Sequence, residues 1–519
     1  MLSRPCQQRI LDLPNEILVK IFLVYRSSHR TKSDPWNHRP RRQRACQWAE
    51  LMRVCRHWRD VALASPTLWQ VVDVDKNTSW LKLALERSRG AALELYFHER
   101  ITVLDTIPIL ISEAHRLRKL FLPRLVRTDL LALAPLFDTP MPVLSELKVY
   151  IEEPHDVSAS ATIHFHLSAA SRPCLRSIRL PCMVVPWSPE SISRMRYLHL
   201  RECTALDAGL TFDQFLDSLA SCTELEELRI HRFVSTISHR VPANFDRTIV
   251  LPRLRKLTIG DTPALCGKVL SAIQLPANIT LRVVGWIDDN LEARHARRLF
   301  LSMIPENKRT LLALMRTLKQ ARVDFTFTPL IQARGDSGSM ILKLRWDVDM
   351  DDYTERALAE FGSIFEDVPL EDLHINCTPH TVPNLVPWVR LFVSFPRLHT
   401  LSVLPGQTLR PIWSALAGRG LPLFELDADG TRAMAEMLLP RLRSLDMEYL
   451  AWDEDAMGFI LESLRRRAMW GLPKLDYLSI AFFEGMENRQ KVRDEINRAL
   501  PYYEENVKSF ASTFEWGWT

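Results

Sequence analysis

Glycine is scarce in this chain, and cysteine never occurs in the closely spaced pairs that bind zinc. Only 16 of 519 residues are glycine, about 3% against a usual value of about 7%, which argues against folds built from many tight turns, such as propellers. The nine cysteines include no C-x-x-C pair, and an odd number cannot close into a complete set of disulfides. The sequence therefore predicts free thiols in a reducing compartment.

Long apolar runs are missing too. The sequence has no run of about 18 uncharged apolar residues, and its first residues lack the apolar stretch of a signal peptide. Lys and Arg total 67 and Asp and Glu total 62, so the net charge is 67 − 62 = +5, too small for a general nucleic-acid binder. We expect a soluble protein of the cytoplasm or nucleus that binds neither nucleic acid nor membranes.

Catalytic and metal-binding signatures are also lacking. The stretch from Gly260 to Lys268 has the wrong spacing for a P-loop, and Val269 follows it where that loop needs Ser or Thr. Asp352 stands where a calcium loop needs glycine. His164 and His166 have no cysteine at an established zinc spacing, so a strand or loop is the simpler interpretation. We expect a non-catalytic chain without a cofactor or a metal.

The composition is otherwise that of a folded protein, with one uneven feature. Hydrophobic residues make up 47% and charged residues 25%, which are ordinary globular values. Residues 1–60 hold 13 Lys and Arg against 5 Asp and Glu, a net charge of 13 − 5 = +8, so the remainder sums to 5 − 8 = −3. The excess positive charge is therefore concentrated near the N-terminus.

The N-terminal segment predicts short amphipathic helices. After Pro14, Ile17 and Ile21 recur four residues apart, and Phe22 widens their apolar stripe. A second amphipathic pattern runs over residues 48–62, and a third turn follows it. Helices this short cannot bury all of these branched and aromatic residues among themselves, so part of the apolar surface needs a partner.

The order of these residues resembles an F-box. The segments that carry the resemblance are Leu13-Pro14-Asn15-Glu16-Ile17-Leu18, Ile21-Phe22, Val54-Cys55-Arg56-x-Trp58-Arg59 and Pro66-x-Leu68-Trp69. The resemblance implies an F-box domain over residues 1–70, a three-helix hook that binds a Skp-type adaptor and thereby a cullin scaffold with its RING subunit. The residues it assigns to adaptor binding are Leu13, Pro14, Ile17, Ile21, Phe22, Leu51, Val54 and Trp58.

A basic insertion departs from the F-box pattern. Residues 27–47 stand where a compact F-box has a short loop. They have no apolar periodicity, and Pro35, Pro40 and several arginines predict a disordered surface loop. A nuclear import signal or a contact with an acidic partner is the alternative to a solvated basic loop.

The rest of the chain repeats one pattern, Pro-x-Leu-x-x-Leu-x-aliphatic, behind helix-like sequence. Alternate apolar residues predict a short strand, and the capping-box residues Thr211 and Gln214 predict the start of one of the helices. The central apolar residues of the first six copies are 27, 31, 20, 30 and 29 residues apart, which is leucine-rich-repeat spacing. These markers are Leu120, Leu147, Ile178, Leu198, Leu228 and Leu257, and later copies centre on Leu373, Leu401, Leu445 and Leu478.

This pattern resembles a leucine-rich-repeat solenoid. We expect an α/β chain with an all-α hook at residues 1–70, a connecting segment at 71–100, and an irregular solenoid with a curved parallel sheet at 101–519. Copies of the pattern are weak over residues 281–370. Hook and solenoid together resemble F-box proteins with a leucine-rich-repeat receptor domain, a common organisation among fungal F-box-like proteins.

The resemblance implies the substrate receptor of a ubiquitin ligase, in which the solenoid binds a target protein. A scaffold that acts outside any ligase is the alternative. On the solvent side of the predicted strands, basic residues precede acidic ones, which are Asp446 and Glu448. The residues predicted to bind an acidic or phosphorylated target are Arg179, His199, Arg201, Arg229 and His231. A merely solvated strand face is the alternative to such a site.

Overall fold

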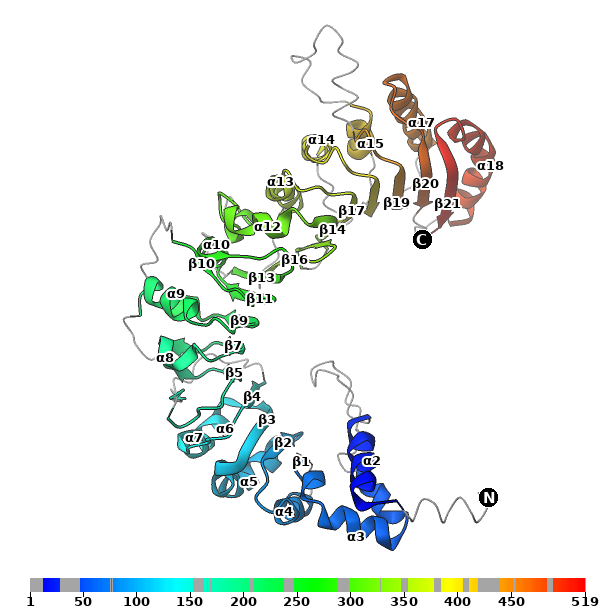
Figure 1. The fold of residues 1–519 in the computed structure, drawn as a ribbon. Helices are drawn as coiled ribbons and strands as arrows, with labels where there is room; N and C mark the ends of the chain where they lie inside the picture. Colours follow the sequence, from blue (N-terminus) through cyan, green and yellow to red (C-terminus); the bar gives the residue numbers. More distant parts are fainter. Residues whose placement is uncertain are drawn as a thin grey trace. The chain divides into compact units, whose positions relative to one another are not determined.

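The computed structural model divides the chain into two compact units. Unit 1 comprises residues 1–225 with 236–238, and unit 2 comprises residues 226–235 with 239–519. Within each unit, helices line one side of an array of strands (Figure 1). The residues that the structure describes are 13–28, 47–74, 76, 78–152, 163–165, 167–168, 170–205, 210–237, 247–287, 298–326, 328–346, 353–377, 384–404, 410–418, 439–450, 454–482 and 489–518.

Unit 1 begins with a helical hook. Its elements are α2 (Asn15–Ser28), the 3-10 helix η1 (Gln47–Arg53), α3 (Arg56–Ala64) and the 3-10 helix η2 (Pro66–Trp69). Leu18 and Phe22, one turn apart on α2, are fully buried, and the Phe22 ring lies 5.2 Å from that of Trp58 between centroids. The indole N–H of Trp69 donates to the carbonyl of Ala62 over 2.9 Å. These short helices therefore share one aromatic core.

The predicted basic insertion falls almost wholly on residues 29–46. These lie outside the described residues, and so does His166. The other histidine of that pair, His164, forms an isolated parallel bridge with Val184.

Tryptophan rings join the hook to the first repeat. The ring of Trp69 lies 5.1 Å from those of both Trp48 and Trp80, measured between centroids. The elements of this repeat are β1 (Val71–Val74), α4 (Thr78–Arg87) and β2 (Leu93–Phe97). Because β1 and β2 pair in parallel, the segment 71–100, predicted as a connection, already contains the first two strands. Its strands lack the spaced leucines from which the array was predicted.

Further parallel strands extend unit 1. They are β3 (Leu117–Leu125), β4 (Glu146–Ile151), β5 (Ser177–Pro181) and β7 (Tyr197–Arg201), and β6 (Val184–Val185) pairs with β8 (Thr204–Ala205). The helices are α5 (Arg100–Ser112), η3 (Ala114–Arg116), α6 (Arg127–Ala132), α7 (Ala134–Asp138), α8 (Pro189–Ile192) and α9 (Phe212–Ala220). The parallel register aligns one buried residue from each strand: Leu95, Leu120, Leu147, Ile178 and Leu198.

The repeat pattern thus predicted both the strands and their buried depth. The capping box predicted for α9 is also present. The Thr211 hydroxyl accepts from the backbone N–H of Gln214 over 3.2 Å, and the Gln214 side chain accepts from the N–H of Thr211 over 2.9 Å. This repeat therefore consists of a helix, a turn and a strand, as expected.

Unit 2 continues the alternation of strands and helices. Its strands are β9 (Glu227–His231), β10 (Ile249–Val250), β11 (Lys256–Asp261), β12 (Ile273–Gln274), β13 (Thr280–Ile287), β14 (Leu318–Asp324), β15 (Leu330–Gly335), β16 (Ser339–Trp346), β17 (Asp372–Asn376), β18 (Thr400–Leu404), β19 (Ser444–Leu450), β20 (Leu475–Phe482) and β21 (Ala511–Trp518). Its helices include α10 (Pro263–Ala272), η5 (Leu301–Met303), η6 (Arg309–Leu311), α12 (Leu312–Met315), α13 (Tyr353–Phe365), α14 (Leu385–Ser394), α15 (Arg410–Leu416), α17 (Glu454–Met469) and α18 (Arg489–Val507). The fold is α/β, parallel-dominated, solenoid-like and not closed.

The weak repeats over residues 281–370 correspond to a change in strand order. The strand β13 pairs with β16, β15 lies between β16 and β14, and β14 pairs with β17. The pairs formed by β15 are antiparallel, so this hairpin is a local exception in a sheet that is otherwise parallel-dominated, as predicted. The turn before β16 packs closely against the segment that precedes β13, since a Cβ at Gly338 would lie 2.3 Å from the carbonyl oxygen of Ala277. A hairpin needs no intervening helix, which explains why the helix-strand spacing is lost here.

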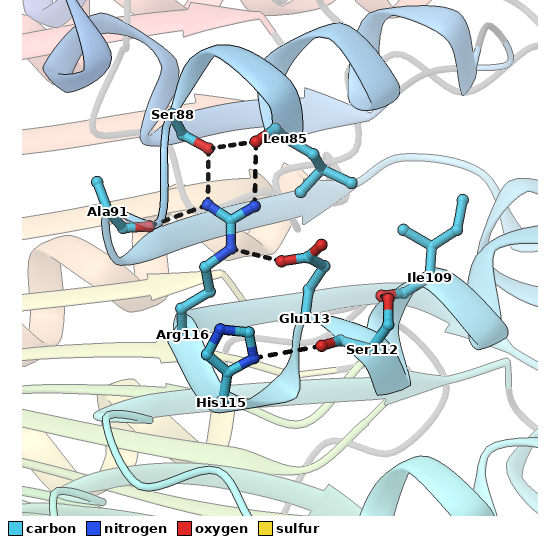
Figure 2. Close-up of polar contacts among 8 residues, drawn as sticks. All are labelled: Leu85, Ser88, Ala91, Ile109, Ser112, Glu113, His115 and Arg116. Atoms are coloured by element: carbon cyan, nitrogen blue, oxygen red, sulfur yellow. Dashed lines mark hydrogen bonds and ion pairs between the residues drawn. The ribbon is translucent and has the colours of Figure 1, made fainter.

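A buried arginine ties the early repeats of unit 1 together (Figure 2). Arg116, in η3, donates from Nη1 to the hydroxyl of Ser88 over 2.7 Å and from Nη2 to the carbonyl of Leu85 over 3.1 Å. It also donates to the carbonyl of Ala91 over 3.3 Å and pairs through Nε with Glu113 at 2.5 Å. The end of α4 leaves backbone carbonyls without helical partners, and this guanidinium satisfies one of them.

Candidate functional site

The hook presents an apolar stripe on α2. Ile17 and Ile21 are each 40% exposed and Val24 is 66% exposed, whereas Leu18 and Phe22 on the same helix are fully buried. Residues spaced i, i+4 and i+7 share one face of a helix. One face of α2 therefore packs into the hook while another carries exposed branched side chains. We call Ile17, Ile21 and Val24 the hook stripe.

The residues predicted to bind the adaptor differ in exposure. Those exposed at the surface are Pro14, Ile17, Ile21 and Val54, of which Val54 is 59% exposed. Those partly buried are Leu13, Leu51 and Trp58. Phe22 is fully buried against Trp58, so it belongs to the hook core and offers no surface to a partner in this structure.

Val24 is a surface residue that the sequence prediction left out. It lies two turns after Ile17, and the heptad-like spacing of the two is the signal that indicates it. The apolar residues of α2 lie on most sides of the helix, so the sequence pattern alone does not distinguish its buried face from its exposed face.

The strand face of unit 1 brings two of the predicted target-binding residues together. Arg179 and His199 are register partners on β5 and β7, and Arg179 is also paired in register with Lys148 on β4. The guanidinium of Arg179 lies 4.1 Å from the ring centroid of Tyr150. Arg201 stands two residues further along β7 and forms an ion pair with Glu202 at 3.5 Å. The predicted target-binding residues of unit 1 thus occupy two different register positions.

The other two predicted residues, Arg229 and His231, lie on β9 of unit 2. Arg229 forms an ion pair with Glu227 and shares a row of register partners that runs through the whole unit. Basic residues occupy one end of this row and acidic residues the other, as the sequence predicts. The row is Arg229, Thr258, Arg282, Ile341, Gln332, Arg322, His374, Ser402, Asp446, Ser479 and Glu515.

Buried cysteines in the described chain are poor nucleophiles. Burial raises the pKa of Cys203, Cys222, Cys266 and Cys377 to about 12, so these thiols stay protonated at neutral pH. Among the described residues, no group of three or more His, Cys, Asp and Glu side chains is placed to hold a metal ion.

Comparison with known proteins identifies the hook. Residues 10–75 match the F-box-like family model. This range covers α2, η1, α3 and η2 and ends within the first repeat, beyond the predicted boundary at residue 70. No curated protein matches the chain.

A solved structure resembles this chain only weakly. The structure titled "Crystal structure of TLR13-ssRNA13 complex" matches over 72% of this chain and 46% of its own, with 13% sequence identity and a TM-score of 0.28. The chain thus spans less than half the length of that protein. No helix in the described ranges combines the length and the apolarity needed to cross a membrane.

Proposed function

We propose that this chain is the substrate-receptor subunit of a Skp-cullin-F-box ubiquitin ligase. The observation that supports it best is an F-box-like hook whose hook stripe remains exposed although the hook has a complete aromatic core. Folding alone does not explain exposed branched residues along one helix face, whereas a helical partner that covers them does. A Skp-type adaptor is the partner that F-box domains generally bind.

The proposed role needs no chemistry by this chain. The hook is tethered through the adaptor to a cullin and RING subunit, and the strand face binds a target protein. Holding the target beside a ubiquitin-charged enzyme raises its effective concentration, which accelerates transfer without a catalytic residue here. The proposed setting is the cytoplasm or the nucleus.

The proposed target surface is the strand face of each unit. Its basic positions, Arg179, His199, Arg201, Arg229 and His231, are only partly buried. Arginine pairs in two-point fashion with carboxylate or phosphate, so an acidic or phosphorylated segment is the proposed ligand class. Arg201 and Arg229 already pair with neighbouring glutamates, so part of their positive charge is compensated within the chain.

Coexpression with a Skp-type adaptor and a cullin tests the proposed function. We expect the full-length chain to copurify with both proteins in a stoichiometric complex. Copurification with the adaptor alone, while the cullin is absent from the complex, would favour the alternative of a scaffold outside any ligase. Failure to bind the adaptor would contradict the proposed function.

Charge reversal tests the target surface. The triple variant Arg179→Glu, Arg201→Glu, Arg229→Glu is expected to lose at least tenfold in recovery of its target proteins, because each change replaces attraction to an anion by repulsion. Quantitative mass spectrometry of copurified proteins, with the ligase inhibited, provides the measurement. Adaptor binding should stay unchanged, since the hook is untouched.

The matched control reverses three arginines of unit 2 that are exposed and off the strands: Arg397, Arg441 and Arg465. Their reversal changes the net charge equally. If both triple variants keep the same set of partners as the unmodified chain, the strand face at these positions does not bind the target.

A further inference from the structure

Positive charge gathers around one tryptophan of unit 2, on strands β13 and β16 and just after strand β9. Trp286 on β13 and Arg345 on β16 are register partners, and the Arg345 guanidinium lies 4.9 Å from the ring centroid of Trp286. The guanidinium of Arg232, which follows β9, lies 4.6 Å from the same ring. Arg282 lies on β13, four residues before Trp286, and Lys343 lies on β16, two residues before Arg345. We call Arg232, Arg282, Trp286, Lys343 and Arg345 the basic cluster.

Strand β11 lies between β9 and β13, and it has a glycine, Gly260, opposite the residues that flank the basic cluster. Gly260 on β11 pairs in register with His231 on β9 and with Val284 on β13. A Cβ at Gly260 would lie 2.2 Å from Nδ1 of His231, so the imidazole occupies this space. The backbone N–H of Arg232 donates to the Gly260 carbonyl over 2.6 Å, which fixes the chain where it leaves β9. His231 thereby reaches over β11 toward the basic cluster.

Trp286 holds its two arginines without neutralising them. Guanidinium groups within about 6 Å of an indole ring are attracted to its electron-rich face, but the interaction leaves their N–H donors and full charge available. The indole N–H of Trp286 is itself buried and has no hydrogen-bond partner in the described part of the chain. A buried polar group without a partner costs free energy, and an acceptor supplied by a ligand would recover it.

The charges of the basic cluster repel one another. Burial lowers the pKa of Arg282, and the positive charges of Arg345 and Arg229 lower it further. Burial also lowers the pKa of Lys343, and the positive charges of Arg345 and Arg282 lower it further. Among the described residues, none of the four cations of the cluster forms an ion pair. Of the two carboxylates on strands β9, β11, β13 and β16, Glu227 already pairs with Arg229 and Lys256, and Asp261 is buried and accepts from the backbone N–H groups of Ser235 and Thr262.

We propose that the basic cluster binds a phosphorylated, acidic segment of a partner protein. A phosphate monoester carries nearly two negative charges on three acceptor oxygens, so it can contact several of these cations at once, which a single carboxylate cannot do. Its oxygens can also accept from the guanidinium N–H groups of the basic cluster, for which the described residues supply no carboxylate. The biological meaning of this site rests on the proposed receptor function, but phosphopeptide binding itself does not require the adaptor.

Charge along unit 2 favours a peptide over a nucleic acid. The register row that contains Arg282 continues to Asp446 and Glu515, so a long polyanion that followed the strand face would meet carboxylates. A short segment with one phosphate occupies the basic end alone. The chain as a whole also carries a net charge of only +5.

A binding assay with the full-length chain, copurified with a Skp-type adaptor if that complex forms, tests the proposal. The probe is a fluorescein-labelled nine-residue peptide with a central phosphoserine flanked by glutamates, and its unphosphorylated form is the reference. We expect fluorescence anisotropy to show at least tenfold tighter binding of the phosphopeptide. The triple variant Arg232→Gln, Arg282→Gln, Arg345→Gln should lose that preference, and Trp286→Leu should weaken phosphopeptide binding at least threefold.

The control Arg397→Gln, Arg441→Gln, Arg465→Gln removes the same charge from exposed positions of unit 2 and should bind like the unmodified chain. Melting curves establish that each variant is folded. The proposal is overturned if the two triple variants bind equally, if phosphorylation brings no gain, or if oligothymidylate of equal charge binds as tightly as the phosphopeptide. Adaptor copurification, measured on the same variants, reports on the proposed function separately, because the cluster and the hook share no residue.

Discussion

The double variant Ile17→Asp, Ile21→Asp is expected to lose binding to a Skp-type adaptor by at least a hundredfold while the chain stays folded. Both side chains are already 40% exposed, so the hook core loses little packing. In the complex, each isoleucine would bury its remaining exposed 40%, which contributes about 0.6 to 1.2 kcal/mol of the about 1.5 to 3 kcal/mol expected for complete burial. An aspartate at the same place must be desolvated without a partner, which adds a further cost. Affinity measured by calorimetry with purified adaptor checks the result.

The matched control is the double variant Ile101→Asp, Val250→Asp. These residues are 69% and 64% exposed and lie outside the hook, so they undergo the same chemical change without touching the proposed interface. The affinity of this control variant for the adaptor should equal that of the unmodified chain. Equal affinities for the hook variant and the control would show that the hook stripe is not where the adaptor binds.

Phe22→Ala separates the core of the hook from its surface. Phe22 is fully buried, so its truncation should cost about 3 to 5 kcal/mol in stability and weaken adaptor binding only through unfolding of the hook. Added adaptor should then restore part of the thermal stability of the hook, since binding draws the unfolded hook back to the folded state. Ile17→Asp, Ile21→Asp should show no such recovery, because in that variant the interface itself is changed.

The repeat array was predictable because its buried leucines recur at one depth. Leu120 and Leu147 are register partners, as are Leu401 and Leu445, and each occupies the position that the repeat pattern assigns. A strand of this kind must turn alternate residues inward, so the spacing of leucines contains most of the architecture. The hook followed from the same logic, since its aromatic and branched residues recur at helical spacing.

The phase of α2 and the basic cluster were not predictable, for different reasons. Because Ile21 and Phe22 are adjacent and α2 is apolar on most sides, periodicity does not decide which of them is buried. In the basic cluster, Trp286 and Arg345 come from strands separated by a hairpin, and only the register of β13 with β16 brings them together. The local sequence around either residue does not predict that pairing.

Arg116 is an instance in which sequence reasoning missed a residue with a large expected effect on stability. In sequence it resembles its neighbour Arg118, but Arg116 is buried and Arg118 is exposed. The difference arises because the end of α4 supplies carbonyl and hydroxyl oxygens around the guanidinium of Arg116 alone. An arginine becomes a core residue where its donors can all find acceptors.

Arg116→Met is therefore expected to destabilise the first repeats of unit 1 by about 3 to 5 kcal/mol, because it leaves the partly buried Glu113 carboxylate without its cation and removes the donor to the Ser88 hydroxyl and the Ala91 carbonyl. Amide hydrogen exchange in β2 and α4 should accelerate at least a hundredfold, since about 1.4 kcal/mol corresponds to a factor of ten. Exchange followed by mass spectrometry resolves these segments from unit 2.

The control for this prediction is Arg298→Met, which breaks an exposed pair with Glu306 at 3.0 Å. Solvent screens such a pair, so it contributes about 0 to 1 kcal/mol, and exchange around residue 298 should change little. Arg116→Lys should fall between the unmodified chain and Arg116→Met, because an ammonium keeps the charge beside Glu113 but cannot reach Leu85, Ser88 and Ala91 together with the planar donor geometry of a guanidinium. Unchanged exchange in β2 and α4 of Arg116→Met would mean that apolar packing, and not this network, holds the first repeats together.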